Sequence, residues 1–437
     1  MATQAQEHPE TQAQEHPETQ AQEDPERQTA LQEIVGGMRY VARQPILDLR
    51  GRVHGYELLF RAGPEAVFRG DGDLATRTVL DNTILFGLEK LTGGLPAFVN
   101  CTSEALIGNL VHVLPSGMTE LEILESLDPT PALIAACTRL KAEGFRLALD
   151  DFAWSPRFDP LVKLADYIKV DFLLTSAFER QNLLKRLSGV TVALLAEKIE
   201  TQEEYRQACK EGFTLFQGYY FCRPVLLENR EIPANRLSHI EILQLLQSES
   251  IDLHKLTRLL KRDASLTYRL LRLVNSPMYG IRQEVRSIQA ALLAVGEDAF
   301  RRIALLTIAS ELNDGQPAEI LRMAFVRARF CEEAAGQCAL DSTEQYLTGL
   351  LSLLPAMLRL PMEELTPLLP LRMEIREALG GRANPERVLL EWLESHERGD
   401  WAACDATVLA HRLSQEALLE CYAGALMWAE AALKSVV

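Results

Sequence analysis

The segment RLALDDF (Arg146–Phe152) decides how the first half of the chain folds, because it joins an apolar, strand-like run to two acidic residues. Similar short runs recur between Met38 and Pro224, and segments with helical spacing of apolar residues separate them. The predicted strands are 40–47, 53–60, 96–100, 120–124, 146–152, 167–172, 192–199 and 215–221. Strands that alternate with helices predict a parallel sheet, and a closed sheet of this kind is an α/β TIM-like barrel.

The second half of the chain predicts only helices. In LHKLTRLLKRDASLTYRLLRLVNSPMYG (253–280), leucines recur at spacings of three and four, and Pro277 then stops the run. Similar patterns continue to about residue 434, with Pro and Gly between or near their ends. We therefore predict a barrel domain over 38–232 and an all-α domain over 233–437.

The chain begins with three near-copies of the octapeptide TQAQEHPE over residues 3–26. The repeat has no apolar face to bury and carries a proline in every unit, which predicts a disordered tail over 1–37. Seven acids and one base in residues 1–27 contribute −6 of the formal net charge of −16. This charge argues against direct binding of DNA, because phosphate binding depends on clustered Lys and Arg.

The sequence also predicts a cytoplasmic protein without a membrane span. Eight Cys are scattered without a Cys-x-x-Cys pair, as expected of buried thiols in a reducing compartment. No apolar run reaches the roughly 18 residues that span a bilayer, and the first residues lack a basic-then-apolar signal pattern.

Polar side chains gather at the carboxyl ends of the predicted strands, which meet on one face of a βα barrel. They are Glu57, Asn100, Glu122, Glu125, Asp150, Asp151, Lys169, Asp171, Glu197, Glu200 and Gln217. Taken singly, each acid could be a helix cap or a solvated loop residue, the Asp150-Asp151 pair a turn, and Lys169 an ordinary ion-pair partner. Their joint occurrence favours a site.

Converging carboxylates and one amide oxygen repel each other unless a cation holds them, and hard oxygen donors suit Mg²⁺, Mn²⁺ or Ca²⁺. With two neighbouring aspartates, one carboxylate could bridge two ions, an arrangement that clamps the attacking and leaving oxygens of a phosphodiester. A lysine among the acids can stabilise developing phosphate charge. The pattern predicts metal-dependent hydrolysis of a phosphate ester.

Residues 40–226 resemble the EAL family, phosphodiesterases that open cyclic di-GMP to the linear dinucleotide pGpG on a TIM-like barrel. The matching segments are RQPILD (43–48), GYELLFR (55–61), FVN (98–100), LEILE (121–125), LALDDF (147–152), YIKVD (167–171), AEKIET (196–201) and FQGYYFCRP (216–224). Both their order and their spacing fit the family.

This resemblance implies roles for individual residues. Metal ligands for Mg²⁺ or Mn²⁺, with two ions possible, are Glu57, Asn100, Glu122 and Asp150, with Asp151 next to the second ion. Catalytic candidates are Lys169 and Glu197, which resemble the groups that position and activate water, together with Asp171 and Glu200. Dinucleotide contacts are Gln44, Arg61 and Gln217, and Glu125 resembles the residue that braces the loop after Asp151.

Two departures from the family pattern bear on turnover. The signature tripeptide is Glu57-Leu58-Leu59 rather than Glu-Ala-Leu, and alternation along the strand sends Leu58 outward, where extra volume affects packing rather than chemistry. The family follows its aspartate pair with Phe-Gly-Thr-Gly, a flexible loop, whereas this chain has Phe152-Ala153-Trp154-Ser155-Pro156. A bulkier and stiffer loop is expected here.

Residues 237–430 resemble the HDOD domain, a helical relative of HD phosphohydrolases, most clearly in DASLTYRLLRLVNSPMYG (263–280) and SIQAALLAVG (287–296). None of the eight His is followed by Asp, so this half lacks the metal-binding pair of an HD enzyme. The resemblance implies a regulatory or protein-interaction module with an unknown protein partner. Within it, Asn275, Ser276 and Pro277 are expected either to cap a helix or to contact a ligand.

Two functions remain open at this point. The barrel is either a metal-dependent cyclic di-GMP phosphodiesterase that the HDOD domain tunes, or a cyclic di-GMP receptor or scaffold whose output is a protein contact. The retained acids and Lys169 favour the enzyme, and the altered loop favours the receptor. Related barrels often pair, so a homodimer is also an open expectation.

Overall fold

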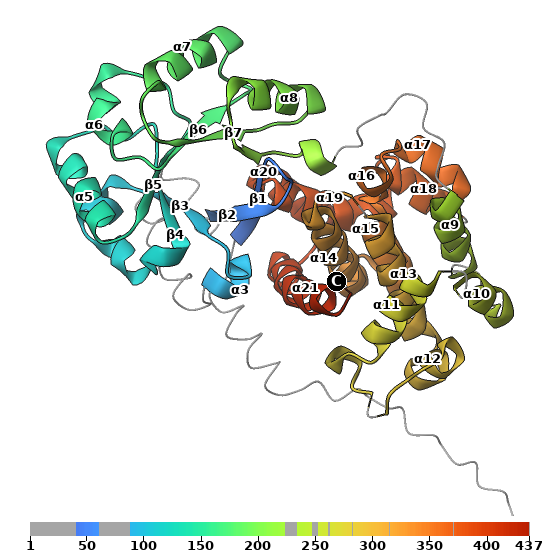
Figure 1. Cartoon of the computed structure of the whole chain (residues 1–437). Helices are drawn as coiled ribbons and strands as arrows, with labels where there is room; N and C mark the ends of the chain where they lie inside the picture. The colour runs from blue at the N-terminus through green and yellow to red at the C-terminus, as the bar shows by residue number, and fades with distance from the viewer. Residues whose placement is uncertain are drawn as a thin grey trace, which may run out of the picture.

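Eight strands close into a barrel in the first half of the chain (Figure 1). The computed structural model describes residues 41–60, 88–222, 234–246, 252–260, 263–281, 283–313, 315–369 and 371–436. The strands are β1 (Val41–Asp48), β2 (Val53–Phe60), β3 (Ala97–Cys101), β4 (Thr119–Ile123), β5 (Arg146–Leu149), β6 (Tyr167–Asp171), β7 (Ala193–Glu197) and β8 (Leu215–Gln217). The predicted α/β TIM-like barrel is confirmed.

The prediction of a fully parallel sheet is wrong at one strand. β1 pairs antiparallel with both β2 and β8, whereas the pairings from β2 round to β8 are parallel. Only residues 49–52 separate β1 from β2. A parallel crossover needs a dozen or more residues, so this short link can only form a hairpin.

Helices pack against the outer face of the parallel strands (Figure 1). The longer described ones are α5 (Pro131–Ala142), α7 (Ala177–Leu187) and α8 (Gln202–Glu211), with short helices α3 (Leu88–Thr92), α4 (Ser103–Ile107) and α6 (Asp159–Val162). Outward-facing strand residues such as Leu121, Leu147 and Val170 are buried beneath this layer. The barrel interior holds a smaller apolar cluster that includes Phe98 and Tyr167.

The described part of the second half contains helices and no strand, as predicted. The helices are α9 (Ala234–Leu246), α10 (Leu253–Leu260), α11 (Ala264–Val274), α12 (Ile288–Val295), α13 (Glu297–Leu312), α14 (Ala318–Ala334), α15 (Ser342–Leu351), α16 (Leu354–Leu358), α17 (Met362–Leu365), α18 (Met373–Leu379), α19 (Val388–Glu397), α20 (Trp401–His411) and α21 (Gln415–Val436). Asn275 caps α11, and its side chain bonds the backbone of Leu271 and Val285, so the capping alternative holds.

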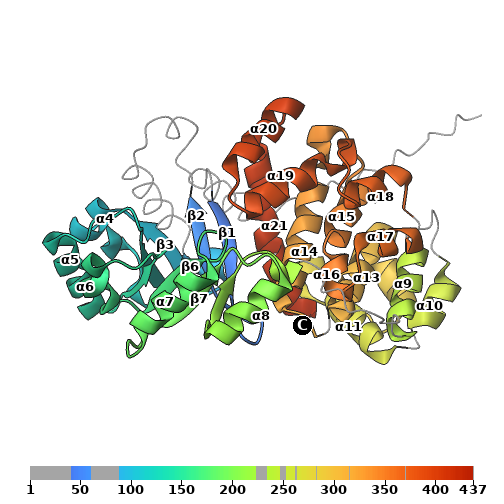
Figure 2. The ribbon, with the colours of Figure 1, turned by 90° about the horizontal axis from the view of Figure 1, so that it is seen from above.

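The β1–β2 hairpin is the part of the barrel that meets the helical half. Figures 1 and 2 both place β1 and β2 beside α14, α19 and α21, with the parallel strands on the far side. The tail predicted to be disordered and the junction near residue 232 lie outside the described residues. The domain boundaries therefore remain predictions.

Candidate active site

The strand register brings the predicted acids together at the carboxyl ends of the parallel strands. Asn100 of β3 pairs with Glu122 of β4, and Asp171 of β6 pairs with Glu197 of β7. On the hairpin, Gln44 of β1 pairs with Glu57 of β2. Residues level with one another in adjacent strands share a face, so their polar side chains converge inside the barrel mouth.

Lys169 stands at the centre of this convergence. Its side chain is fully buried, and its Nζ lies 2.6 Å from Glu122, 2.7 Å from Asp150, 2.9 Å from Glu197 and 3.4 Å from Glu57. We call these four carboxylates and the lysine the Lys169 ring. The ring therefore places four carboxyl groups around a single ammonium inside the barrel.

Burial dominates the protonation of the ring. It raises the pKa of Glu122 well above its ordinary value despite the opposing Lys169 ammonium, and raises the pKa of Glu197 to about 8. Burial alone would lower the pKa of Lys169, but the surrounding carboxylates, Glu122 first, together raise it well above its usual range. Lys169 is therefore held in its charged form, while burial favours the protonated form of Glu122 and Glu197.

Some oxygens of the ring region lack partners, which tests whether a cation would fit. Glu122 Oε2 and Asn100 Oδ1 are buried and accept no hydrogen bond from any described residue. Buried polar atoms normally have a partner, and oxygens of this type are the ligands that Mg²⁺ and Mn²⁺ take. As they stand, no three His, Cys, Asp or Glu of the described residues form a group that could hold a metal ion. The donor chemistry fits a hard cation, while the geometry is closed around Lys169.

A chain of amides links the ring to β1 and β8. Gln217 donates from Nε2 to Glu57 Oε2 at 2.6 Å and to Gln44 Oε1 at 2.8 Å, and Asn100 donates to Glu57 Oε1 at 3.3 Å. Gly218 makes this position of Gln217 possible. Its φ is 141°, and a Cβ there would lie 2.2 Å from the carbonyl oxygen of Ile199.

A second cluster of charges lies beside the ring. Lys198 bonds Asp171 Oδ2 and lies 3.9 Å from Asp151 Oδ1. Both Lys198 and Asp151 have left-handed backbones, with φ of 55° and 41°. Such conformations cost on the order of 1 kcal/mol for residues other than glycine and concentrate at functional sites. Asp171 also caps the turn after β6 by accepting from the N–H groups of Leu173 and Leu174.

The loop after Asp151 packs against α7. Trp154 lies beneath the guanidinium of Arg186, which is 3.8 Å from the ring centroid, and Phe152 meets Phe158 edge to face. Between this loop and α7 is a cavity of about 450 Å³, whose walls include Asp151 and Asp171. That volume is in the range of small-molecule sites.

Comparisons with known proteins agree with this architecture. The EAL domain model matches residues 100–224, and the HDOD domain model matches residues 232–365. The chain is 37% identical over 400 residues to the uncharacterized protein YuxH of Bacillus subtilis (strain 168), covering 89% of this chain and 97% of YuxH. This chain is an EAL–HDOD protein. Its second relative, the cyclic di-GMP phosphodiesterase CdgJ of Vibrio cholerae, is 33% identical over 369 residues, which is 83% of this chain and 85% of CdgJ.

Among solved structures, the EAL–HDOD protein is similar to Klebsiella pneumoniae BlrP1 in a complex with calcium and cyclic di-GMP. The two are 23% identical with a TM-score of 0.35, and the match covers 41% of this chain and 54% of that chain. The described helices of the EAL–HDOD protein include none with the length and apolar character needed to cross a bilayer.

Three predicted site residues of the EAL–HDOD protein are not part of the Lys169 ring: two lie away from it, and one lies outside the described residues. Glu200 follows β7, half-buried, and its backbone N–H donates to Glu204. Glu125 is exposed and makes no hydrogen bond or ion pair with the part of the chain that the structure describes. Arg61 lies outside the described residues. Their proposed roles stay predictions.

Sequence reasoning missed two features of this EAL–HDOD protein. Lys198 sits within AEKIET, but nothing in a single sequence shows that its backbone turns left-handed towards Asp171. The second is Glu397 of α19, whose carbonyl oxygen accepts a hydrogen bond from Gln44 across 353 positions of sequence. Only the folded chain places these residues beside the barrel mouth.

Proposed function

We propose that the barrel hydrolyses cyclic di-GMP to pGpG with Mg²⁺ or Mn²⁺, and that the HDOD half regulates it or binds a protein partner. The Lys169 ring carries this proposal, because it gathers four buried carboxyl groups with oxygen donors at the strand ends where barrel enzymes build their sites. The name of the relative CdgJ supports the same substrate. Cytoplasmic location and a homodimer remain part of the proposal.

Each group of the ring has a role in this reaction. Glu57, Asn100, Glu122 and Asp150 would hold the ion, and Asp151 would lie next to a second one. The ion would supply positive charge to the phosphodiester oxygens during displacement. Lys169 would add positive charge for the phosphate, and Glu197, in its ionised form, would take a proton from the attacking water. Gln44, Gln217 and Arg61 would orient the dinucleotide, and Asp171 would hold Lys198 beside Asp151.

A receptor function is the second candidate, and specific observations favour it. Lys169 already fills the centre of the ring, and the described residues hold no ready-made metal group. The loop that contains Trp154 packs against Arg186 of α7, whereas the EAL family has a flexible loop at this position. A barrel of this kind could bind cyclic di-GMP without opening it, and pass that state to a protein partner of the HDOD half.

Incubation of the full chain with cyclic di-GMP and Mn²⁺ or Mg²⁺ tests the proposal, with product followed by chromatography and bound dinucleotide by equilibrium dialysis. Wild-type protein should form pGpG, and Glu57→Ala and Lys169→Ala should lose on the order of 10²-fold or more of that rate. Matched variants at exposed positions, Glu89→Ala and Lys163→Ala, should keep it.

Binding without product would support the receptor instead. If the protein shows no binding of cyclic di-GMP and forms no product, both functions are contradicted. Circular dichroism of each variant distinguishes loss of chemistry from loss of fold.

A further inference from the structure

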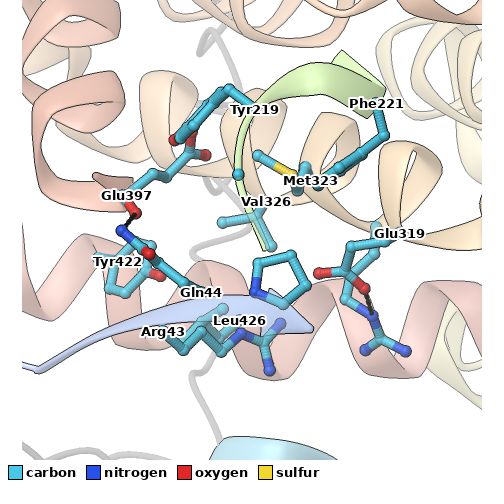
Figure 3. Close-up of a pocket in the computed structure, with 13 residues that line it drawn as sticks. Arg43, Gln44, Tyr219, Phe221, Glu319, Met323, Val326, Glu397, Tyr422 and Leu426 are labelled. Carbon is cyan, nitrogen blue, oxygen red and sulfur yellow. Dashed lines mark hydrogen bonds and ion pairs between the residues drawn. The ribbon is translucent and has the colours of Figure 1, made fainter. Parts of the chain in front are cut away.

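Gln44 connects the barrel site to the helical half (Figure 3). Its Nε2 donates to the backbone carbonyl oxygen of Glu397 at 3.3 Å. Its Oε1 accepts from Gln217. A carbonyl oxygen only accepts hydrogen bonds, so this contact fixes which end of the Gln44 amide faces α19. The other end then faces Gln217, whose own amide is oriented to donate to Glu57. The helix thereby sets the orientation of amides that reach the Lys169 ring.

Glu397 is itself held in place. Arg327 of α14 binds its carboxylate at two points, with Nη2 at 2.6 Å and Nε at 3.1 Å, and Tyr219 donates to it at 3.2 Å. The Arg327 and Glu397 side chains are 3% and 8% exposed. An ion pair made through two parallel hydrogen bonds restricts the relative position of its partners. Because the pair is buried, removing either partner would leave the other charge uncompensated. The last turn of α19 is therefore held both by α14, through Arg327, and by the segment after β8, through Tyr219.

Further contacts along the same edge keep the two halves together. His396 donates from Nε2 to the carbonyl oxygen of Val41 at 3.2 Å, and Tyr56 donates to Glu319 of α14 at 2.9 Å. Gly399 has a φ of 70°, and a Cβ there would lie 2.6 Å from a methyl carbon of Leu59. Beside Gln44 and Glu397 the interface leaves a cavity of only about 40 Å³, room for a few water molecules.

We propose that Glu397 is a positioning residue for the barrel's ligand site, so that the helical half completes the site for cyclic di-GMP. The inference rests on the proposed function and assigns the helical half a structural part in it. The Glu397 carbonyl oxygen directs the Gln44 amide, and one N–H of that amide remains for an acceptor on the dinucleotide. Gln217 Oε1, buried and without a partner among the described residues, is the matching acceptor for a donor on the ligand.

The test measures the Kd of the full-length protein for cyclic di-GMP in the presence of Ca²⁺. Glu397→Gln weakens the Arg327 pair that holds the last turn of α19, so the carbonyl oxygen of residue 397 is no longer held against Gln44. Binding should weaken about three- to tenfold, the worth of one hydrogen bond. The matched control is Glu394→Gln, one turn earlier on α19, which also pairs with Arg327 but does not touch Gln44. The control should leave Kd unchanged.

A double-mutant cycle separates positioning from general destabilisation. In a Gln44→Ala background, Glu397→Gln should weaken binding no further, whereas an effect that persists there would overturn the proposal. Equal weakening by Glu394→Gln would overturn it as well. If Glu397→Gln does not fold, Tyr219→Phe takes its place, since it removes one bond to Glu397 without stranding a charge. It should weaken binding about twofold, and again only when Gln44 is present.

Two results point to different failures. Wild-type protein that binds no cyclic di-GMP would remove the proposed function. If the wild-type protein, Glu397→Gln and Tyr219→Phe bind cyclic di-GMP with the same Kd, only the proposed role of Glu397 is contradicted.

Discussion

The position of Lys169 at a strand end could be predicted from the sequence, but its contacts with the surrounding carboxyl groups could not. The sequence puts it at the end of β6, among strand ends that carry acids. Its fully buried ammonium, within 3.4 Å of four carboxylates, follows from the barrel radius and the register, which no local pattern encodes. The predicted acids Glu57, Glu122 and Glu197 were brought together for the same reason.

Lys198 leads to a prediction at the same scale. Its ammonium shares the space beside Asp151 and Asp171 that a second divalent ion would use, so the wild-type protein should bind one Mn²⁺ per chain tightly. Lys198→Gln removes the competing charge and should strengthen binding of a second Mn²⁺ about tenfold.

Titration of free Mn²⁺ by electron paramagnetic resonance measures both steps. Lys163→Gln, at an exposed lysine of the barrel, is the control and should behave as wild type. Two tight ions in the wild-type protein, or no gain in Lys198→Gln, would contradict the prediction.

At the scale of elements, the strands were predictable and their directions were not entirely so. Most predicted strands end within a few residues of the observed ones, because apolar runs bounded by turn residues mark them well. The Arg146–Phe152 prediction ran past β5, since the left-handed backbone of Asp151 ends the strand early. The antiparallel β1 was missed although the short link at 49–52 already required a hairpin.

The C-terminal turn of α19 makes stability depend on pH through His396. Burial lowers the pKa of His396 to about 4, and its neighbours Trp392, Trp401 and Tyr422 are aromatic. The unfolded chain binds a proton near the ordinary pKa of 6.5, while the folded chain does not until about 4. The contribution of neutral His396 to the free energy of unfolding is therefore complete above pH 6.5. It is lost as pH falls, so that the free energy of unfolding is lower by about 3 kcal/mol at pH 4.

Urea unfolding at pH 7.5 and pH 5.0 measures this effect. Between these pH values, the free energy of unfolding of His396→Gln should fall by about 2 kcal/mol less than that of the wild-type protein. The exposed His411→Gln should retain the wild-type dependence. A wild-type slope that survives in His396→Gln would assign the acid sensitivity to other groups.

At the scale of the whole molecule, ligand binding in the barrel and packing of α19 should be linked. Because the Glu397 carbonyl oxygen orients Gln44, a ligand that favours this orientation must also favour the docked helix. Cyclic di-GMP with Ca²⁺, the ion of the binding test, should slow amide hydrogen exchange in α19 (Val388–Glu397), by up to about 100-fold at a ligand concentration 100 times Kd.

The comparison within one molecule provides the control. Exchange in α12 (Ile288–Val295), which lies far from the barrel in Figure 1, should change least. Slower exchange in the barrel strands with α19 unaffected would show that the halves act independently.

The position of β1 also governs the order in which the protein can assemble during translation. β1 is the first of the described strands to be made, yet it must pair with β8, and its first residue, Val41, then contacts His396 of α19. At about 5–20 residues per second, a ribosome needs roughly 10–30 s to pass from β1 to β8, and a comparable time again to reach α19. Throughout that interval the β1–β2 hairpin presents buried-type residues such as Tyr56 and Val41 without their final cover. Closure of the barrel at β1 and β8 and docking of α19 therefore come late in the synthesis of the chain.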